Sequence, residues 1–192
     1  MVKLTAIQLT STPNVEANLL FIEQQLAGLA FSDNHLVVLP ECCLFFGGKD
    51  AEQLALAKET YADNSLVKRL SALAKKFAVN LVAGSIPIYQ PESDKFTNTS
   101  CVFLSSGEKI AQYDKIHLFD VNVEDNEKSY RESRFTQAGN RVVNVNVKDF
   151  NVGLTICYDL RFPELYRQLA TQGAQIITVP SAFTQVTGKA HW

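Results

Sequence analysis

The chain has 192 residues, of which 46% are hydrophobic and 20% charged, and its formal net charge at pH 7 is -2. These values are ordinary for one soluble globular domain and exclude a disordered chain. The small net charge provides no basic surface for nucleic acid, and no apolar run reaches the roughly 20 residues of a membrane helix. The first residues, MVKLTAIQLT, lack a signal-peptide core. We therefore expect a cytoplasmic domain without nucleic-acid or membrane partners.

The cysteines indicate reduced thiols. Cys42, Cys43, Cys101 and Cys157 have neither the paired spacing of metal ligands nor the density of a disulfide scaffold. We expect no bound metal and no disulfide.

Strands and helices alternate in the first half of the chain. Alternating apolar residues predict a strand over 3–10, and Asn14 can cap a helix that runs through Leu26. The run LVVLPE (36–41) predicts a buried strand that stops at its proline. A second helix is expected from Asn64 to Phe77, followed by a strand over 80–89.

The second strand-rich stretch looks like a hairpin. Pro87 is expected to end the paired part of the preceding strand, and residues 98–106 and 109–115 then form two strands joined at Gly107. Residues 120–141 are polar without a period, which is typical of an exposed or active-site loop.

The last part repeats a strand-helix-strand order. A strand is expected over 141–147, another from Val152 to Cys157, a helix over 163–172, and a final strand within 174–183. No repeat or linker divides the chain, so the pattern predicts one α/β domain. It leaves one side of the sheet open, with an unpaired edge.

Cys157 lies at a predicted strand-to-helix corner. Ligands bind at the carboxyl ends of strands in open α/β sheets, and a helix N-terminus can depress the pKa of a thiol. A nucleophile fits this corner, although free cysteine is also a common inert core residue.

Three other reactive groups follow apolar runs or lie in the polar loop. Glu41 follows LVVLP, Lys115 follows KIAQYD, and Glu132 lies in the loop. Together with Cys157 they supply a nucleophile, proton carriers and a cation for the oxyanion, which is a full set for acyl transfer from an amide. Taken alone, Glu41 is more often an exposed strand-end residue, Lys115 a solvated surface lysine and Glu132 one of many loop charges.

Several motifs, in this order, carry a family resemblance: VVLPE, YDKIHLFD, YRES and GLTICYDLRFPEL. The chain resembles the carbon–nitrogen hydrolase (nitrilase) superfamily over essentially its whole length. TSTPNVEANL and PSAFTQVTGKAHW also resemble the branch that contains deaminated-glutathione amidase and omega-amidase.

The resemblance implies a role for each matching residue. Glu41 would be the general base, Lys115 would stabilise the tetrahedral oxyanion, and Cys157 would be the nucleophile. The backbone N–H of Tyr158 would complete the oxyanion site, and Glu132 would position the lysine or the substrate amide. A neutral thiol is only slightly ionised at pH 7, so a nearby cation and base would help to generate the nucleophile.

The resemblance also implies the fold and the assembly. Family members form an α-β-β-α sandwich, need no metal or organic cofactor, and often form dimers. Their chains continue past the HW equivalent, so we expect a single hydrolase domain over 1–192 that lacks the C-terminal part of the family domain. We expect a homodimer if the fold is completed, and favour a truncated product or fragment.

Other polar residues near the motifs have more than one interpretation. Arg161 could bind a substrate carboxylate through its guanidinium fork, or form an ion pair with Asp159 or Glu164. His117 and His191 suggest a Cys–His pair, which we discount because a glutamate and a lysine already fill the base and electrophile roles.

The leading hypothesis is an amidase that cleaves the amide of a small carboxylate-bearing molecule, of the deaminated-glutathione or ω-amide type, and releases ammonia. Nitrile hydrolysis by the same residues is the nearest alternative. A catalytically inactive fragment or interaction module is the alternative from another class.

Overall fold

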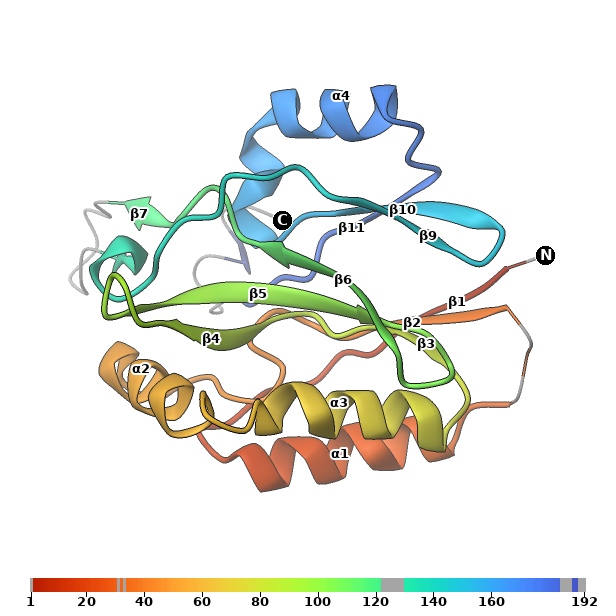
Figure 1. Ribbon diagram of the computed structural model, residues 1–192, viewed down its shortest axis with the longest axis horizontal. Helices are drawn as coiled ribbons and strands as arrows, with labels where there is room; N and C mark the ends of the chain where they lie inside the picture. The colour runs from red at the N-terminus through yellow and green to blue at the C-terminus, as the bar shows by residue number, and fades with distance from the viewer. Residues whose placement is uncertain (1, 31, 33, 122–129, 184–187, 190–192) are drawn as a thin grey trace.

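Two β-sheets lie face to face, and helices cover the outer face of each (Figure 1). The computed structural model describes residues 2–30, 32, 34–121, 130–183 and 188–189. From bottom to top in Figure 1, the layers are helices, the larger sheet, the smaller sheet and a single helix. This arrangement confirms the expected α-β-β-α sandwich.

Within the described residues, the larger sheet has six strands in the order β1-β2-β3-β5-β4, with β6 also paired to β5. Their bounds are β1 (Lys3–Ala6), β2 (His35–Val38), β3 (Asn80–Val82), β4 (Ile86–Gln90), β5 (Lys95–Phe103) and β6 (Lys109–Asp114). The pairs β1–β2 and β2–β3 are parallel and therefore need crossover connections. Helices provide them: α1 (Val15–Ala27), and α2 (Asp50–Glu59) with α3 (Ser65–Lys76).

The helix caps partly follow the prediction. The Asn14 side chain caps α1 by accepting a hydrogen bond from the Ala17 N–H at 3.0 Å, as expected. Asn64 stands at the N-cap of α3 but adopts a left-handed backbone with φ 52° and makes no side-chain cap. The Ser65 N–H instead donates to Asp63 Oδ1 at 2.9 Å.

Helix α2 was not predicted. Its two leucines, Leu54 and Leu56, are two residues apart and cannot share one helical face, so the segment has no apolar stripe to detect.

The strand predicted over 80–89 is broken into β3 and β4 at residues 83–85, where Gly84 has φ +49°. The expectation that Pro87 ends the pairing was wrong, because Pro87 pairs with Asn98 in the β4–β5 ladder. β4 lies at the end of the strand order, where a proline interrupts no further ladder.

The smaller sheet has the order β11-β10-β9 in the part of the chain that is described. Its strands are β9 (Asn144–Val147), β10 (Phe150–Leu154) and β11 (Ile176–Thr178), each shorter than predicted. Helix α4 (Pro163–Thr171) begins with its predicted proline and connects the parallel strands β10 and β11.

Short elements join the layers near one end of the sheets. They are β7 (Asp120–Val121), β8 (Tyr130–Arg131), the 3-10 helix η1 (Glu132–Arg134) and the 3-10 helix η2 (Cys157–Arg161). The segment predicted as a loop over 120–141 therefore contains a small β-pair and a helical turn. The thiol was expected at the end of a strand, but β10 ends three residues earlier, at Leu154, and Cys157 starts η2.

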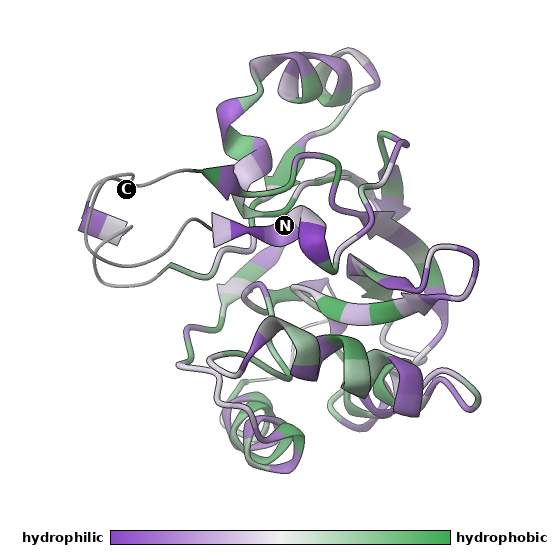
Figure 2. Cartoon of the chain, turned by 90° about the vertical axis from the view of Figure 1, so that its left-hand side faces the viewer, coloured by the Kyte–Doolittle hydropathy of each residue, from purple (hydrophilic) through white to green (hydrophobic). Residues whose placement is uncertain are grey.

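Two apolar cores fill the spaces between the layers. One lies between α1, α3 and the larger sheet and includes Ile22, Leu70 and Leu81. The other lies between the two sheets and includes Val102 and Leu154. Figure 2 shows hydrophobic and hydrophilic residues alternating along the outer helices, as amphipathic helices covering a sheet do.

Cys42, Cys43, Cys101 and Cys157 are free thiols in the structure. None of the helices in the described ranges is long and apolar enough to cross a membrane.

Candidate active site

The structure brings the four expected reactive residues together at one end of the sheets. Glu41 follows β2, Lys115 follows β6, Glu132 begins η1 and Cys157 begins η2. The Lys115 Nζ lies 2.9 Å from Glu41 Oε1 and 3.0 Å from Glu132 Oε2. The Cys157 thiol is close enough to Glu41 and Lys115 for both charges to act on its pKa.

A close backbone contact shapes the turn that carries Glu41. The Pro40 carbonyl accepts a hydrogen bond from the Ser85 N–H at 3.3 Å, and the Cys42 N–H donates to Ser85 Oγ at 2.8 Å. A Cβ added to Gly84 would lie 1.8 Å from the Pro40 oxygen. The break between β3 and β4 therefore needs glycine, and it fixes the Glu41 turn.

The Glu41 carboxylate is 6% exposed and is surrounded by donors. Its Oε1 accepts from Lys115 Nζ at 2.9 Å and from Asn98 Nδ2 at 3.0 Å, and its Oε2 accepts from the Ala182 N–H at 2.9 Å. A buried carboxylate that is bonded in this way keeps a fixed orientation, which a general base requires.

Lys115 is 2% exposed and lies between two carboxylates. Burial lowers its pKa, but the negative charges of Glu41 and Glu132 outweigh that effect, so the net shift is upward. The ammonium group therefore stays charged and is available to stabilise a developing oxyanion.

Glu132 binds the other side of the lysine. Its Oε2 accepts from Lys115 Nζ and from the Phe119 N–H at 2.6 Å, and its Oε1 accepts from Asn98 Nδ2 at 3.3 Å. Burial raises the pKa of this carboxyl, and the Lys115 charge opposes that rise.

Cys157 has a left-handed backbone, with φ 47°, which is uncommon for any residue but glycine. Its N–H donates to the Pro180 carbonyl at 2.9 Å. The pKa of the thiol is raised to about 12, mainly by burial; the Glu41 charge adds to the rise, and the Lys115 charge opposes it. The expected depression of the pKa was wrong, because burial dominates and helix α4 begins only at Pro163. The thiol keeps its proton at neutral pH and needs a base.

Sequence analysis missed Asn98 and the segment after β11. Asn98 lies on β5, and its side-chain NH₂ group donates to the carboxylates of Glu41 and Glu132. Its backbone carbonyl accepts a hydrogen bond from the backbone N–H of Lys115 at 2.9 Å. The segment after β11 supplies the carbonyl of Pro180 and the N–H of Ala182. No sequence signal identifies either, because an amide on a strand and a backbone N–H are present in every fold.

The two residues expected to bind substrate both belong to η2. The half-buried Tyr158 ring makes edge contacts with Phe119 and Phe162, with centroid distances of 5.0 and 5.6 Å. Arg161 is exposed at the end of η2.

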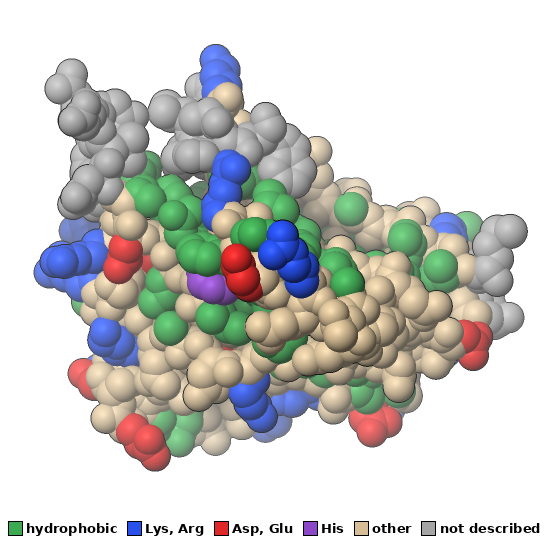
Figure 3. Space-filling view, turned by 90° about the horizontal axis from the view of Figure 1, so that it is seen from above, with side chains coloured by type: hydrophobic (Ala, Val, Ile, Leu, Met, Phe, Trp, Pro, Cys, Tyr) green, Lys and Arg blue, Asp and Glu red, His purple; other side chains and the backbone are tan. Residues whose placement is uncertain are grey.

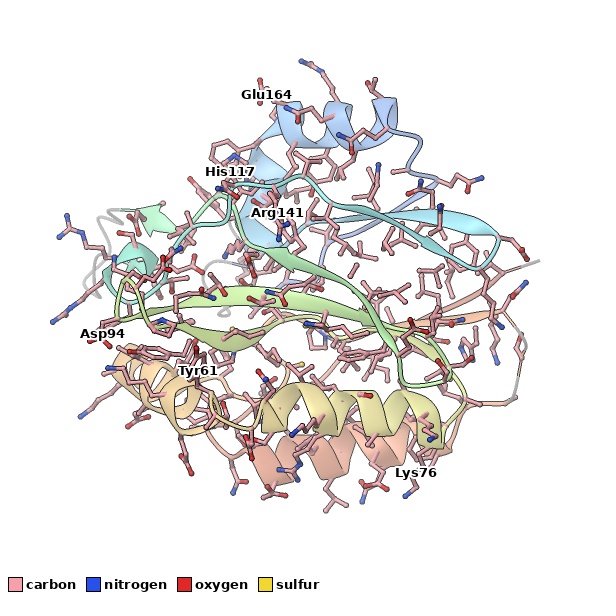
Figure 4. All side chains as sticks on the ribbon, in the orientation of Figure 1. Tyr61, Lys76, Asp94, His117, Arg141 and Glu164 are labelled. Carbon is pink, nitrogen blue, oxygen red and sulfur yellow. The ribbon has the colours of Figure 1, made fainter. Side chains whose placement is uncertain are left out.

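Of the two histidines in the discounted Cys–His alternative, His117 is described, and the contacts given for it are with Asp159 and Phe162. His117 Nδ1 lies 2.7 Å from Asp159 Oδ1, and its ring stacks on Phe162. Figure 4 shows His117 where the chain leaving β6 meets η2, below α4. His191 lies outside the described residues. The described ranges contain no group of three or more His, Cys, Asp or Glu residues arranged to hold a metal.

Apolar side chains gather on the face above the site. Figure 3 shows them around a histidine, with acidic and basic side chains beside it. Tyr130 and Leu160 are the exposed large apolar residues of this region, at 38% and 39%.

Comparison with known proteins finds relatives that all belong to one group of hydrolases. The sequence model described as carbon-nitrogen hydrolase matches residues 3–192. A deaminated glutathione amidase from Yersinia enterocolitica is 42% identical over 187 residues, which cover 97% of this chain and 64% of the relative. The omega-amidase NIT3 from Saccharomyces cerevisiae is 39% identical over all of this chain and 67% of its own length. The chain thus spans about two thirds of these curated relatives.

Solved structures support the same fold. Saccharomyces cerevisiae Nit3, a member of branch 10 of the nitrilase superfamily, matches with a TM-score of 0.79 and 34% identity, over 100% of this chain and 68% of that one. The Caenorhabditis elegans NitFhit protein matches with a TM-score of 0.86 and 34% identity, over 100% of this chain and 47% of that one.

Proposed function

Because the chain belongs to the carbon-nitrogen hydrolase family, we propose that it is a thiol amidohydrolase that cleaves the amide C–N bond of a small carboxylate-bearing molecule. One observation carries this proposal: a buried lysine is bonded to two carboxylates, and the charges of this group act on the Cys157 thiol beside it. That arrangement holds a nucleophile, a base and an oxyanion ligand together.

In the first half of the reaction, Cys157 Sγ forms a bond to the amide carbon while its proton passes to Glu41. Lys115 and the Tyr158 N–H stabilise the negative charge on the substrate oxygen. The C–N bond then breaks and Glu41 returns the proton to the leaving nitrogen, which departs as ammonia from a primary ω-amide and as an amine from an amide of the deaminated-glutathione type. Cys157 is left as a thioester.

In the second half, Glu41 removes a proton from water, whose oxygen attacks the thioester carbon. The C–S bond breaks, the sulfur regains a proton, and a carboxylic acid leaves. Glu132 fixes Lys115 through both steps. The protons and electrons balance without a metal or an organic cofactor.

The substrate class is inferred from the named relatives. These are a deaminated glutathione amidase and an omega-amidase, and both names describe amides that also carry a carboxylate. We propose that Arg161 binds that carboxylate, because a guanidinium matches it with two hydrogen bonds. The proposal also includes a cytoplasmic location, a single hydrolase domain over 1–192, and a homodimer if the fold is completed.

The test is ammonia release from a panel of ω-amides and the matching nitriles, by this chain and by a version extended with a homologous C-terminal segment. We expect the Cys157→Ala variant to lose turnover, while Cys101→Ala, which changes a buried thiol in the apolar core between α1, α3 and the larger sheet, keeps it. Activity only in the extended form would make this polypeptide an inactive part of an amidase. Preference for nitriles would replace the amide assignment, and wild-type ammonia release by Cys157→Ala would overturn the mechanism.

A further inference from the structure

A fully buried carboxylate joins the cysteine turn to the lysine segment. Asp159 is 0% exposed. Its Oδ2 accepts from the Tyr113 hydroxyl at 2.7 Å and the Ile156 N–H at 2.8 Å. Its Oδ1 accepts from the His117 N–H at 3.0 Å and contacts His117 Nδ1 at 2.7 Å. The carboxylate therefore makes four contacts, two on each oxygen.

These partners flank the two reactive residues on both sides. Tyr113 and His117 stand two residues before and two residues after Lys115, and Ile156 directly precedes Cys157. The Tyr113 hydroxyl also accepts the Ile116 N–H at 3.3 Å, so the backbone next to the lysine is held twice. In the described contacts Asp159 itself bonds neither the thiol nor the ammonium.

The four contacts of the Asp159 carboxylate, called the clamp below, also support the backbone turn at Cys157. Cys157 needs a left-handed backbone, and the bond from the Ile156 N–H to Asp159 fixes the residue before it. The Asp159 N–H closes the turn by donating to the Ile156 carbonyl at 3.1 Å. Backbone strain of this kind persists only where the surroundings over-determine it.

We propose that Asp159 is a positioning residue that sets the separation between the Cys157 thiol and the Lys115 ammonium. This proposal deepens and rests on the proposed function. A misplacement of about 1 Å can cost on the order of a hundredfold in rate, so a clamp on both segments controls turnover without touching substrate.

The Asp159→Asn variant tests the clamp with almost no change in volume. An amide has one accepting oxygen, so in either orientation its NH₂ group faces a backbone N–H donor, from Ile156 on one side or from His117 on the other. We expect kcat to fall about a hundredfold while KM changes less than about threefold, because ground-state binding does not depend on the Lys115–Cys157 separation.

A second readout needs no substrate. Iodoacetamide labelling of Cys157 at pH 8, followed by peptide mass spectrometry, reports the state of its turn. Loosening the turn admits water and exposes the thiolate, so we expect labelling to become about tenfold faster. Cys43 and Cys101 are fully buried and serve as internal reporters of unfolding; their labelling should stay at the wild-type level.

Two further variants keep the test decisive. Asn80→Asp disturbs a buried amide at the start of β3, where it bonds the His35 carbonyl and the Ser105 N–H, and should lower stability without altering kcat or Cys157 labelling. Tyr113→Phe removes one donor to Asp159 and should lower kcat about three- to tenfold. If Asp159→Asn does not fold, the effect of Tyr113→Phe on kcat and on Cys157 labelling decides whether Asp159 is a positioning residue.

The outcomes separate the two proposals. Equal effects of Asp159→Asn and Asn80→Asp on kcat and on labelling, or parallel labelling of all the cysteines, would overturn the positioning role. If the wild-type chain releases neither ammonia nor an amine from any amide, the proposed function fails. The change in Cys157 labelling then decides alone whether Asp159 holds the turn.

Discussion

Two regions of the molecule are buried to a similar degree but are stabilised by different forces. One is the polar cluster of Glu41, Lys115 and Glu132, and the other is the apolar core between α1, α3 and the larger sheet. Glu41 and Lys115 are 6% and 2% exposed, and Leu70 and Ile22 are 0% exposed. The core gains stability from removing apolar surface from water. The cluster has to repay the desolvation of three charges through geometry and hydrogen bonds. The core therefore tolerates changes in the identity of its apolar side chains, whereas each charged residue of the cluster depends on its hydrogen-bond partners.

Removal of the shared cation should have the largest effect. Lys115→Met leaves the buried Glu41 and the half-buried Glu132 without a counter-charge, so we expect the free energy of unfolding to fall by about 3–5 kcal/mol and turnover to be lost. Urea unfolding and ammonia release measure the two effects. Lys109→Met, at an exposed lysine on β6, is the matched control and should change neither. A stable, active Lys115→Met chain would contradict the account of the cluster.

Neutralising the base should separate catalysis from thiol reactivity. Glu41→Gln is expected to lower kcat by about 10²–10⁴-fold, because no group then takes the thiol proton. The Glu41 charge also helps to raise the Cys157 pKa to about 12, so its loss moves that pKa downward and increases the thiolate fraction at pH 8. Iodoacetamide labelling of Cys157 should therefore become faster as turnover falls. Slower labelling would mean that Glu41 does not act on the thiol in this way, and Glu108→Gln is the exposed control.

A core truncation should have the smallest effect on chemistry. Leu70→Ala deletes a fully buried side chain of α3, and we expect a loss of about 2–5 kcal/mol in unfolding free energy from lost burial and the remaining cavity. Below the thermal midpoint, kcat and the Cys157 labelling rate should match the wild type. A large change in either quantity would show that the core and the cluster are not independent.

The same comparison explains what could be read from the sequence. The apolar core was predictable because Leu66, Leu70 and Leu73 repeat at helical spacing, and a local pattern is enough to find such a face. Helix α2 was missed because Leu54 and Leu56 give no stripe.

The site could be predicted only where a residue has a reactive or charged side chain. Glu41, Lys115, Glu132 and Cys157 were named from their positions after apolar runs and from family motifs, and the structure places them together. Asn98 and the Ala182 N–H were not found, because their importance comes from a three-dimensional contact with Glu41. The thiol pKa was expected to fall and instead rises, because burial cannot be read from a strand-to-helix corner alone.

The central claim is that Cys157 carries the acyl group of an amide substrate. Rapid acid quenching during turnover of an ω-amide, followed by peptide mass spectrometry, tests this most directly. We predict an acyl thioester on the peptide that contains Cys157, at a level that rises when hydrolysis is slowed, and none in Cys157→Ala. Steady ammonia release with no acyl group on Cys157, or with one on another residue, would contradict it.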